Sequence, residues 1–171
     1  MQGLIQVYTG DGKGKTTAAL GLALRAAGAG LKVFIGQFLK GAEYSEIKAL
    51  RQLAPGIEIK QYGRRCFIKD KPDEEDIRLA QNGLVEMDSV IQSGDYDLVI
   101  LDEANIAVYY NLFSVDELLK VVQNRPKQVE IVITGRNADP RIIAAADLVT
   151  EMREIKHYYQ KGIAARLGIE M

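Results

Sequence analysis

The glycine-rich loop, residues 9–17, constrains the fold of this chain more than any other feature. It has the sequence Thr-Gly-Asp-Gly-Lys-Gly-Lys-Thr-Thr and lies between an apolar run at 4–8 and a helical pattern that starts at residue 15. Alternating glycines let successive backbone N–H groups turn toward one anion, and the N-terminus of a following helix adds partial positive charge. A strand, such a loop and a helix in this order therefore predict a phosphate-binding turn.

The side chains of this loop suit a nucleotide bound together with Mg²⁺. Lys15 is expected to reach the terminal phosphates and act in catalysis, and the Thr16 hydroxyl to ligate Mg²⁺. The residues expected to bind the nucleotide are Thr9, Gly10, Asp11, Gly12, Lys13, Gly14, Lys15, Thr16 and Thr17. The general pattern has a glycine where Thr9 stands, so the loop is a variant. The alternative is a glycine-rich turn that only caps a helix.

An acidic pair, Asp102 and Glu103, follows a second apolar run at residues 98–101. An uninterrupted apolar run is typical of a strand covered on both faces. Such a strand delivers the residues after it to the carboxyl edge of the sheet, where ligands of open α/β sheets bind. Asp102 and Glu103 are therefore the expected metal ligands beside Thr16, directly or through water. The alternative for an acidic residue at this place is a helix cap.

Apolar runs and helical patterns alternate along the whole chain. This alternation predicts an α/β fold of the P-loop NTPase type, with about six mostly parallel strands flanked by helices. Strands are predicted at residues 4–8, 32–38, 57–62, 98–101, 129–134 and 148–152. Helices are predicted at 15–28, 44–53, 73–93 and from 114 to about 124, with a short one after Asp139 and Pro140. The helix at 15–28 is apolar nearly all round, which predicts that it is buried.

Length and composition narrow the class of protein. A length of 171 residues predicts one nucleotide-binding domain over residues 1–171. Lys and Arg number 22 against 23 Asp and Glu, so no basic excess indicates nucleic acid as a partner. The most apolar stretch, 18–31, is too short for a membrane span and contains Arg25, so no membrane partner is expected. The single cysteine, Cys66, forms no internal disulfide and fits a reducing compartment.

Two classes of nucleotide hydrolase lack their motifs in this chain, and a third stays open. A GTPase would carry Asn-Lys-x-Asp after a late strand, whereas the run at 129–134 is followed by Gly135, Arg136 and Asn137. A transporter ATPase would carry Leu-Ser-Gly-Gly, which does not occur. A regulatory ATPase that binds partners in a nucleotide-dependent way stays open, because Glu103 would be able to polarise a water. Arg136 follows a strand at the ligand edge, where it is a candidate contact for the nucleotide.

Several short segments occur in one order along the chain. Besides the glycine-rich loop, they are Gln-Phe-Leu-Lys-Gly at 37–41, Leu-Asp-Glu at 101–103, Thr-Gly-Arg at 134–136, Lys-His at 156–157, Gly162, Ala165, and Gly-Ile-Glu at 168–170. Each segment alone is weakly diagnostic, whereas the ordered set is highly specific. The set resembles the ATP:corrinoid (cob(I)alamin) adenosyltransferases of the CobA/CobO type, and the resemblance extends from residue 4 to residue 170.

The resemblance implies a reaction and its participants. The 5′-deoxyadenosyl group of ATP is transferred to the Co(I) of a corrinoid (cobalamin, cobinamide or an a,c-diamide precursor), and triphosphate is released. The reaction belongs to the biosynthesis or salvage of adenosylcobalamin, the vitamin B12 coenzyme. The resemblance also implies Mg²⁺ with ATP as co-substrate, a reduced flavoprotein as electron donor, a homodimer, a cytoplasmic setting, and an ATP orientation reversed from that of other P-loop ATPases.

The resemblance places an aromatic side chain beside the corrin ring, in the loop at residues 63–69, and Phe67 matches that place. An apolar ring against one axial face of the cobalt would exclude water. Phe67 is therefore expected to ease reduction of Co(II) and to be catalytic. Family members often have a second aromatic here, and many have an extension before the first strand. This chain has Lys69 at the second place and about three residues before its first predicted strand. The alternative for Phe67 is a core residue.

Overall fold

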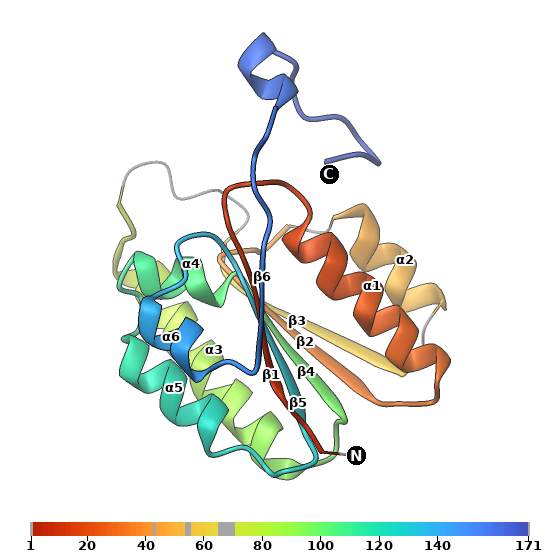
Figure 1. Ribbon diagram of the computed structural model, residues 1–171, viewed down its shortest axis with the longest axis vertical. Helices are drawn as coiled ribbons and strands as arrows, with labels where there is room; N and C mark the ends of the chain where they lie inside the picture. The colour runs from red at the N-terminus through yellow and green to blue at the C-terminus, as the bar shows by residue number, and fades with distance from the viewer. Residues whose placement is uncertain (1, 43, 54–55, 65–70, 171) are drawn as a thin grey trace.

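The computed structural model describes residues 2–42, 44–53, 56–64 and 71–170. Its centre is a six-stranded sheet in which all neighbouring strands are parallel, in the order β3-β2-β4-β5-β1-β6 (Figure 1). The strands are β1 (Ile5–Thr9), β2 (Val33–Phe38), β3 (Ile57–Tyr62), β4 (Leu98–Asp102), β5 (Glu130–Thr134) and β6 (Leu148–Glu151). The predicted α/β fold, with a mostly parallel sheet flanked by helices, is confirmed.

Helices cover both faces of this sheet (Figure 1). One face carries α1 (Lys15–Gly28) and α2 (Ser45–Leu53), and the other carries α3 (Glu74–Ser93), α4 (Ala104–Tyr109), α5 (Val115–Gln123) and α6 (Pro140–Ala145). A turn of 3₁₀ helix, η1 (Tyr158–Lys161), lies in the C-terminal tail beyond β6. Because both faces are covered, every residue of β2 and β4 is buried, which explains the uninterrupted apolar run at residues 98–101.

Two apolar cores lie on the two sides of the sheet. Successive residues of a strand point to opposite faces, so Phe34 belongs to one core and Ile35 to the other. The larger core contains Met87 of α3, and the smaller contains Ala23 of α1. Together the two cores fix the positions of the strands in the sheet.

Local sequence signals set the ends of several helices. Ser114 and Glu117 form a capping box at the start of α5, in which the Ser114 hydroxyl accepts from the Glu117 N–H at 3.2 Å. Asp139 caps α6 by accepting from the Arg141 N–H at 2.8 Å. The first N–H groups of a helix have no hydrogen-bond partner within it, and each cap side chain supplies one. This stabilises the helix start at residues 114 and 139.

The structure differs from the sequence predictions at two helices. Helix α1 is buried only along the stripe that faces the sheet, and Leu24 on its other side is 53% exposed. A helix that packs on one face of a sheet needs only one apolar stripe, so its additional apolar residues face outward. Helix α4 was not predicted, because its N-cap is Glu103 in a left-handed conformation and carries no side-chain cap. None of the helices in the described ranges combines the length and the hydrophobicity that a membrane span requires.

The strand order determines which loops meet. Strand β5 lies between β1 and β4, with Tyr8 beside Thr134, and β2 lies on the other side of β4, with Gln37 beside Asp102. Since all the strands are parallel, their carboxyl ends share one edge of the sheet. The residues that follow β1, β2, β4 and β5 therefore converge there, and the tail after β6 extends past the same edge (Figure 1).

Candidate active site

The glycine-rich loop joins β1 to α1 at this edge, as predicted. Gly10 and Gly14 have φ of 92° and 114°, in the region that favours glycine, and Gly14 is the N-cap of α1. A Cβ atom on Gly12 would lie 2.7 Å from the Met152 carbonyl oxygen, to which the Gly12 N–H donates at 2.7 Å. The glycines thus permit both the turn and its close contact with the chain beyond β6.

Lys15 lies at the centre of this turn and is only 7% exposed. Its ammonium donates to the carbonyl oxygens of Gly10 at 2.6 Å and Gly12 at 2.7 Å. Burial, together with repulsion from Arg136, lowers the pKa of Lys15, although the charges of Glu103 and Asp11 oppose this. The loop's own carbonyls therefore hold this cation in place.

Asp102 ends β4 and is completely buried. One carboxylate oxygen, Oδ1, accepts from the hydroxyls of Thr16 at 2.9 Å and Thr134 at 2.6 Å. The other, Oδ2, accepts from the Gln37 amide at 2.9 Å and pairs with the Lys40 ammonium at 2.7 Å. Burial acts to raise the pKa of Asp102, but attraction to Lys40 and these donors outweighs it, so the pKa is lowered. The carboxylate is therefore held ionised beside Thr16.

Lys40 was missed as a site residue in the sequence analysis. Its ammonium also lies 3.3 Å from the Thr16 hydroxyl, and it is 5.9 Å from the centre of the Tyr44 ring. Lys40 follows β2, and the sequence does not state that β2 and β4 are neighbours in the sheet. The motif Gln-Phe-Leu-Lys-Gly at 37–41 was the available signal, because it follows an apolar strand at the ligand edge.

Glu103 starts α4 with a φ of 62°, a conformation that is uncommon for residues other than glycine. Its backbone N–H donates to the Thr134 hydroxyl at 2.9 Å, which fixes the turn. Burial and repulsion from Asp102 raise the pKa of Glu103, although Lys40, Lys15 and Arg136 oppose this. A left-handed turn thus places a carboxylate among cations; backbone strain of this kind is frequent at functional sites.

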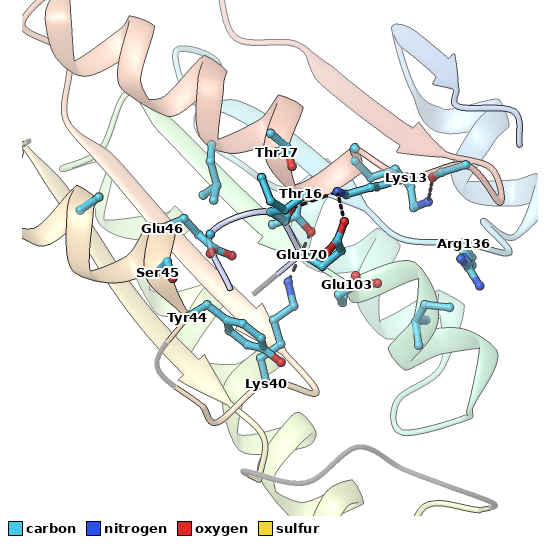
Figure 2. Close-up of a pocket in the computed structure, with 18 of the residues that line it drawn as sticks. Lys13, Thr16, Thr17, Lys40, Tyr44, Ser45, Glu46, Glu103, Arg136 and Glu170 are labelled. Carbon is cyan, nitrogen blue, oxygen red and sulfur yellow. Dashed lines mark hydrogen bonds and ion pairs between the residues drawn. The ribbon is translucent and has the colours of Figure 1, made fainter. Parts of the chain in front are cut away.

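These side chains surround one pocket of about 830 Å³, within the roughly 300–1,000 Å³ typical of small-molecule sites. Figure 2 shows Lys13, Lys40, Glu103 and Arg136 around the same space. The lining residues are Gly12, Lys13, Gly14, Lys15, Thr16, Thr17, Leu20, Lys40, Tyr44, Ser45, Glu46, Ala49, Glu103, Ile106, Arg136, His157, Gly168, Ile169 and Glu170. Most residues of the predicted nucleotide site therefore meet here.

The C-terminal tail closes one side of the pocket. The Lys13 ammonium donates to the Ile169 carbonyl at 3.0 Å and lies 3.2 Å from the Glu170 carboxylate and 3.3 Å from the Tyr158 hydroxyl. Hydrogen bonds from Arg166, Tyr158 and Lys13 hold the pKa of Glu170 well below its usual range. The tail therefore returns to the glycine-rich loop, a contact that no local sequence pattern indicates.

The other predicted site residues lie in different surroundings. Thr9 is buried, and its hydroxyl accepts from the Ala138 N–H at 3.4 Å, while Asp11 is exposed. Thr9, Gly10 and Asp11 do not line the pocket. Phe67 lies outside the described residues. Across the part of the chain that the structure describes, no group of three or more His, Cys, Asp or Glu side chains is arranged to hold a metal ion.

The chain is similar over its full length to known proteins. A model of the family described as ATP:corrinoid adenosyltransferase BtuR/CobO/CobP matches residues 1–171. The corrinoid adenosyltransferase of Pseudomonas aeruginosa is 36% identical over 170 residues, which are 99% of this chain and 84% of that protein. That of Escherichia coli K12 is 35% identical, over 99% of this chain and 86% of its own length. The corrinoid adenosyltransferase CobA of Salmonella typhimurium is 34% identical over the same shares.

Proposed function

We propose, because the chain belongs to the ATP:corrinoid adenosyltransferase family, that it transfers the 5′-deoxyadenosyl group of ATP to the Co(I) of a corrinoid and releases inorganic triphosphate. Membership of this family makes the chain a transferase that adenosylates corrinoids with ATP. We further propose that triphosphate is the leaving group, that the cobalt reacts as Co(I), and which residues form the site. Residues 1–171 are proposed to act as one domain.

The observation that carries this proposal is the concentration of cations around one pocket. Lys13, Lys15, Lys40 and Arg136 all line it, beside the N-terminus of α1. In the proposed step a Co–C bond forms at C5′ while the C5′–O bond breaks, and the bonding electron pair leaves on the triphosphate. Negative charge therefore grows on the triphosphate in the transition state, where fixed cations and N–H donors lower the barrier most.

The side-chain oxygens at Thr16 and Asp102 fit a magnesium ion. The Thr16 hydroxyl and the Asp102 carboxylate are oxygen ligands 2.9 Å apart, of the kind that Mg²⁺ prefers, and Glu103 lies at the same pocket. Thr16 and Asp102 would hold the ion, with Glu103 acting directly or through water. A bound Mg²⁺ would supply positive charge to the triphosphate. Thr134 and Gln37 orient the Asp102 carboxylate for this task.

The transfer needs no general base, because Co(I) carries no proton that must be removed. The protein's tasks are then to hold the triphosphate, to align C5′ with the cobalt and to keep water away. Phe67 is proposed to cover one axial face of the corrinoid. Arg64, three residues before Phe67, forms ion pairs with Asp73 and Asp76 at the start of α3, each at 2.7 Å.

Further participants follow from the family resemblance. A reduced flavoprotein is proposed to supply the electrons that make Co(I), and the setting is proposed to be cytoplasmic. A homodimer is proposed as the assembly. Cobalamin, cobinamide and a,c-diamide precursors are all candidate corrinoids. Asp102 and Glu103 alone would also be compatible with a regulatory ATPase. Family membership favours adenosyl transfer over that alternative.

The test combines ATP, Mg²⁺ and chemically reduced corrinoid with the protein. Absorbance should report formation of a light-sensitive cobalt–carbon bond, and the phosphate product should be triphosphate in an amount equal to that bond. Lys15→Ala serves as the matched variant with a weakened site. Release of orthophosphate at the same rate without any corrinoid, and no new cobalt–carbon bond, would instead establish the regulatory ATPase.

A further inference from the structure

The Lys40 ammonium lies at the point where the proposed metal ligands converge. It is 2.7 Å from Asp102 Oδ2 and 3.3 Å from Thr16 Oγ1, and its side chain is 15% exposed. These are the oxygens that the proposed function gives to Mg²⁺. A protein cation thus lies against both of them in this structure.

Asp102 needs a counter-charge in this position. Its carboxylate is fully buried, and the groups that donate to it from Thr16, Thr134 and Gln37 carry no net charge. Removing one partner of a buried ion pair is strongly destabilising, because the charge left behind has neither water nor a counter-ion. Lys40 supplies that counter-ion in this structure.

Lys40 is also able to leave. It lines the pocket together with Lys15 and Thr16, so its ammonium lies at the border of the space that the triphosphate would fill. A lysine side chain is a flexible four-carbon stem with a compact charge, so it can turn between two anions without backbone movement. Lys15, in contrast, is held by two carbonyls of the glycine-rich loop.

We propose that Lys40 is an exchangeable counter-ion of Asp102, which neutralises this carboxylate while the pocket holds no nucleotide and moves onto the triphosphate when Mg²⁺ takes its place. This inference rests on the proposed Mg-ATP site. It makes Lys40 a nucleotide-binding residue and gives it a second task, because it must compete with the divalent ion for the same oxygens. The divalent ion therefore binds weakly alone and tightly together with phosphates, which give the displaced ammonium a new partner.

The competition is measured without ATP, by adding Mn²⁺ in place of Mg²⁺ to the nucleotide-free protein. Free Mn²⁺ has an EPR signal that is lost on binding. Lys40→Met should bind Mn²⁺ about tenfold more tightly than the wild type or better, because the buried carboxylate then lacks its competing cation. Lys60→Met is the matched control, since Lys60 also forms an ion pair, with Glu86 at 2.6 Å, but on β3 away from the pocket. It should bind Mn²⁺ as the wild type does.

A double variant shows which oxygens are responsible. Asp102→Asn added to Lys40→Met should remove the gain in Mn²⁺ affinity. Equal affinity of the wild type and a folded Lys40→Met overturns the inference, and so does a gain that survives Asp102→Asn. Circular dichroism verifies that each variant is folded.

A measurement on the unaltered side chain covers the case in which Lys40→Met does not fold. The ¹⁵N NMR signal of the Lys40 ammonium, identified by its loss in Lys40→Arg, should change little with Mg²⁺ alone and shift when inorganic tripolyphosphate is added with Mg²⁺. A signal that shifts fully with Mg²⁺ alone contradicts the inference. Neither experiment contains a corrinoid, so a failed transferase assay beside intact competition would reject only the proposed function.

Discussion

At the scale of single residues, Asp102 organises the electrostatics of the site. Hydroxyls from α1 and β5, an amide from β2 and an ammonium from the chain after β2 all bind to one carboxylate. Four segments of the chain therefore depend on one buried charge. A change at any of these donors is expected to alter the position of Thr16, and with it the metal and phosphate contacts.

Lys15→Ala and Thr16→Ala are expected to slow adenosyl transfer, each by at least about tenfold, or about 1.4 kcal/mol of transition-state stabilisation. The first removes a charge from the triphosphate and the second a proposed metal ligand. Transfer rates at saturating ATP measure the effect, with Lys60→Ala as the control for loss of a lysine. Wild-type rates in both variants would show that the glycine-rich loop does not bind the triphosphate.

Glu103→Gln gives a prediction about pH. Burial and the charge of Asp102 raise the pKa of Glu103, so the folded protein holds this proton more tightly than the unfolded chain does. The stability that this proton contributes is complete below the ordinary glutamate pKa and is lost as pH rises through the raised pKa. Glu103→Gln cannot ionise, so its free energy of unfolding relative to wild type should increase as pH rises above about 4.5 and level off above the raised pKa.

Urea denaturation of the nucleotide-free protein across this range measures the difference. Glu154→Gln, on the exposed tail, is the control for replacing a glutamate by glutamine. If Glu103 also helps to hold Mg²⁺, the same variant should need more Mg²⁺ for transfer. A stability difference for Glu103→Gln that does not change with pH would contradict the environment described for this carboxyl.

At the scale of elements, the strands and most helices follow from local sequence. Periodicity and caps predict α1, β3 and α5 to within a residue or two, because those signals come from neighbours along the chain. Helix α4 could not be predicted in this way, since its start depends on the left-handed conformation of Glu103. The role of Lys40 could not be predicted either, because its contact with Asp102 follows only from the order of the strands in the sheet. The acidic pair and the glycine-rich loop were placed at one edge correctly, since parallel strands share that edge.

Gly12→Ala should be costly, because its new Cβ would lie 2.7 Å from the Met152 carbonyl oxygen and 2.9 Å from that of Arg153. Backbone must move to relieve this contact, which costs about 1–3 kcal/mol of unfolding free energy. Gly21→Ala, in the interior of α1, meets nothing within 4 Å and should instead stabilise by roughly 0.5–1 kcal/mol. Urea denaturation and ATP binding distinguish the two. Equal stability of both variants would show that the chain just beyond β6 does not restrain the loop.

At the scale of the whole molecule, the tail is separate from the cores. None of the described residues from 152 to 170 is buried, yet His157, Gly168, Ile169 and Glu170 line the pocket. Lys13 joins the loop to a carboxylate 157 positions later. Sequence patterns do not encode a contact of this separation, which is why the tail's place could not be predicted.

Removal of residues 156–171 should therefore change binding more than stability. The unfolding free energy should stay within about 1 kcal/mol of the full chain, since no buried apolar side chain is lost. Affinity for ATP, measured by calorimetry, should fall because the pocket loses one wall. Glu170→Gln is a milder variant that weakens the tail's ion pair with Lys13. Loss of the folded state in the shortened chain would show that the tail supports the sheet.

Strand β6 also has a consequence for handling the protein at high concentration. It forms one edge of the sheet, all four of its residues are exposed, and Leu148 and Val149 are 45% and 41% exposed. An apolar edge strand has unpaired backbone groups on its outer side and invites strands of other molecules to add, the first step of β-rich aggregation. Val149→Lys should therefore delay the rise in light scattering of a stored, concentrated sample without slowing its chemistry.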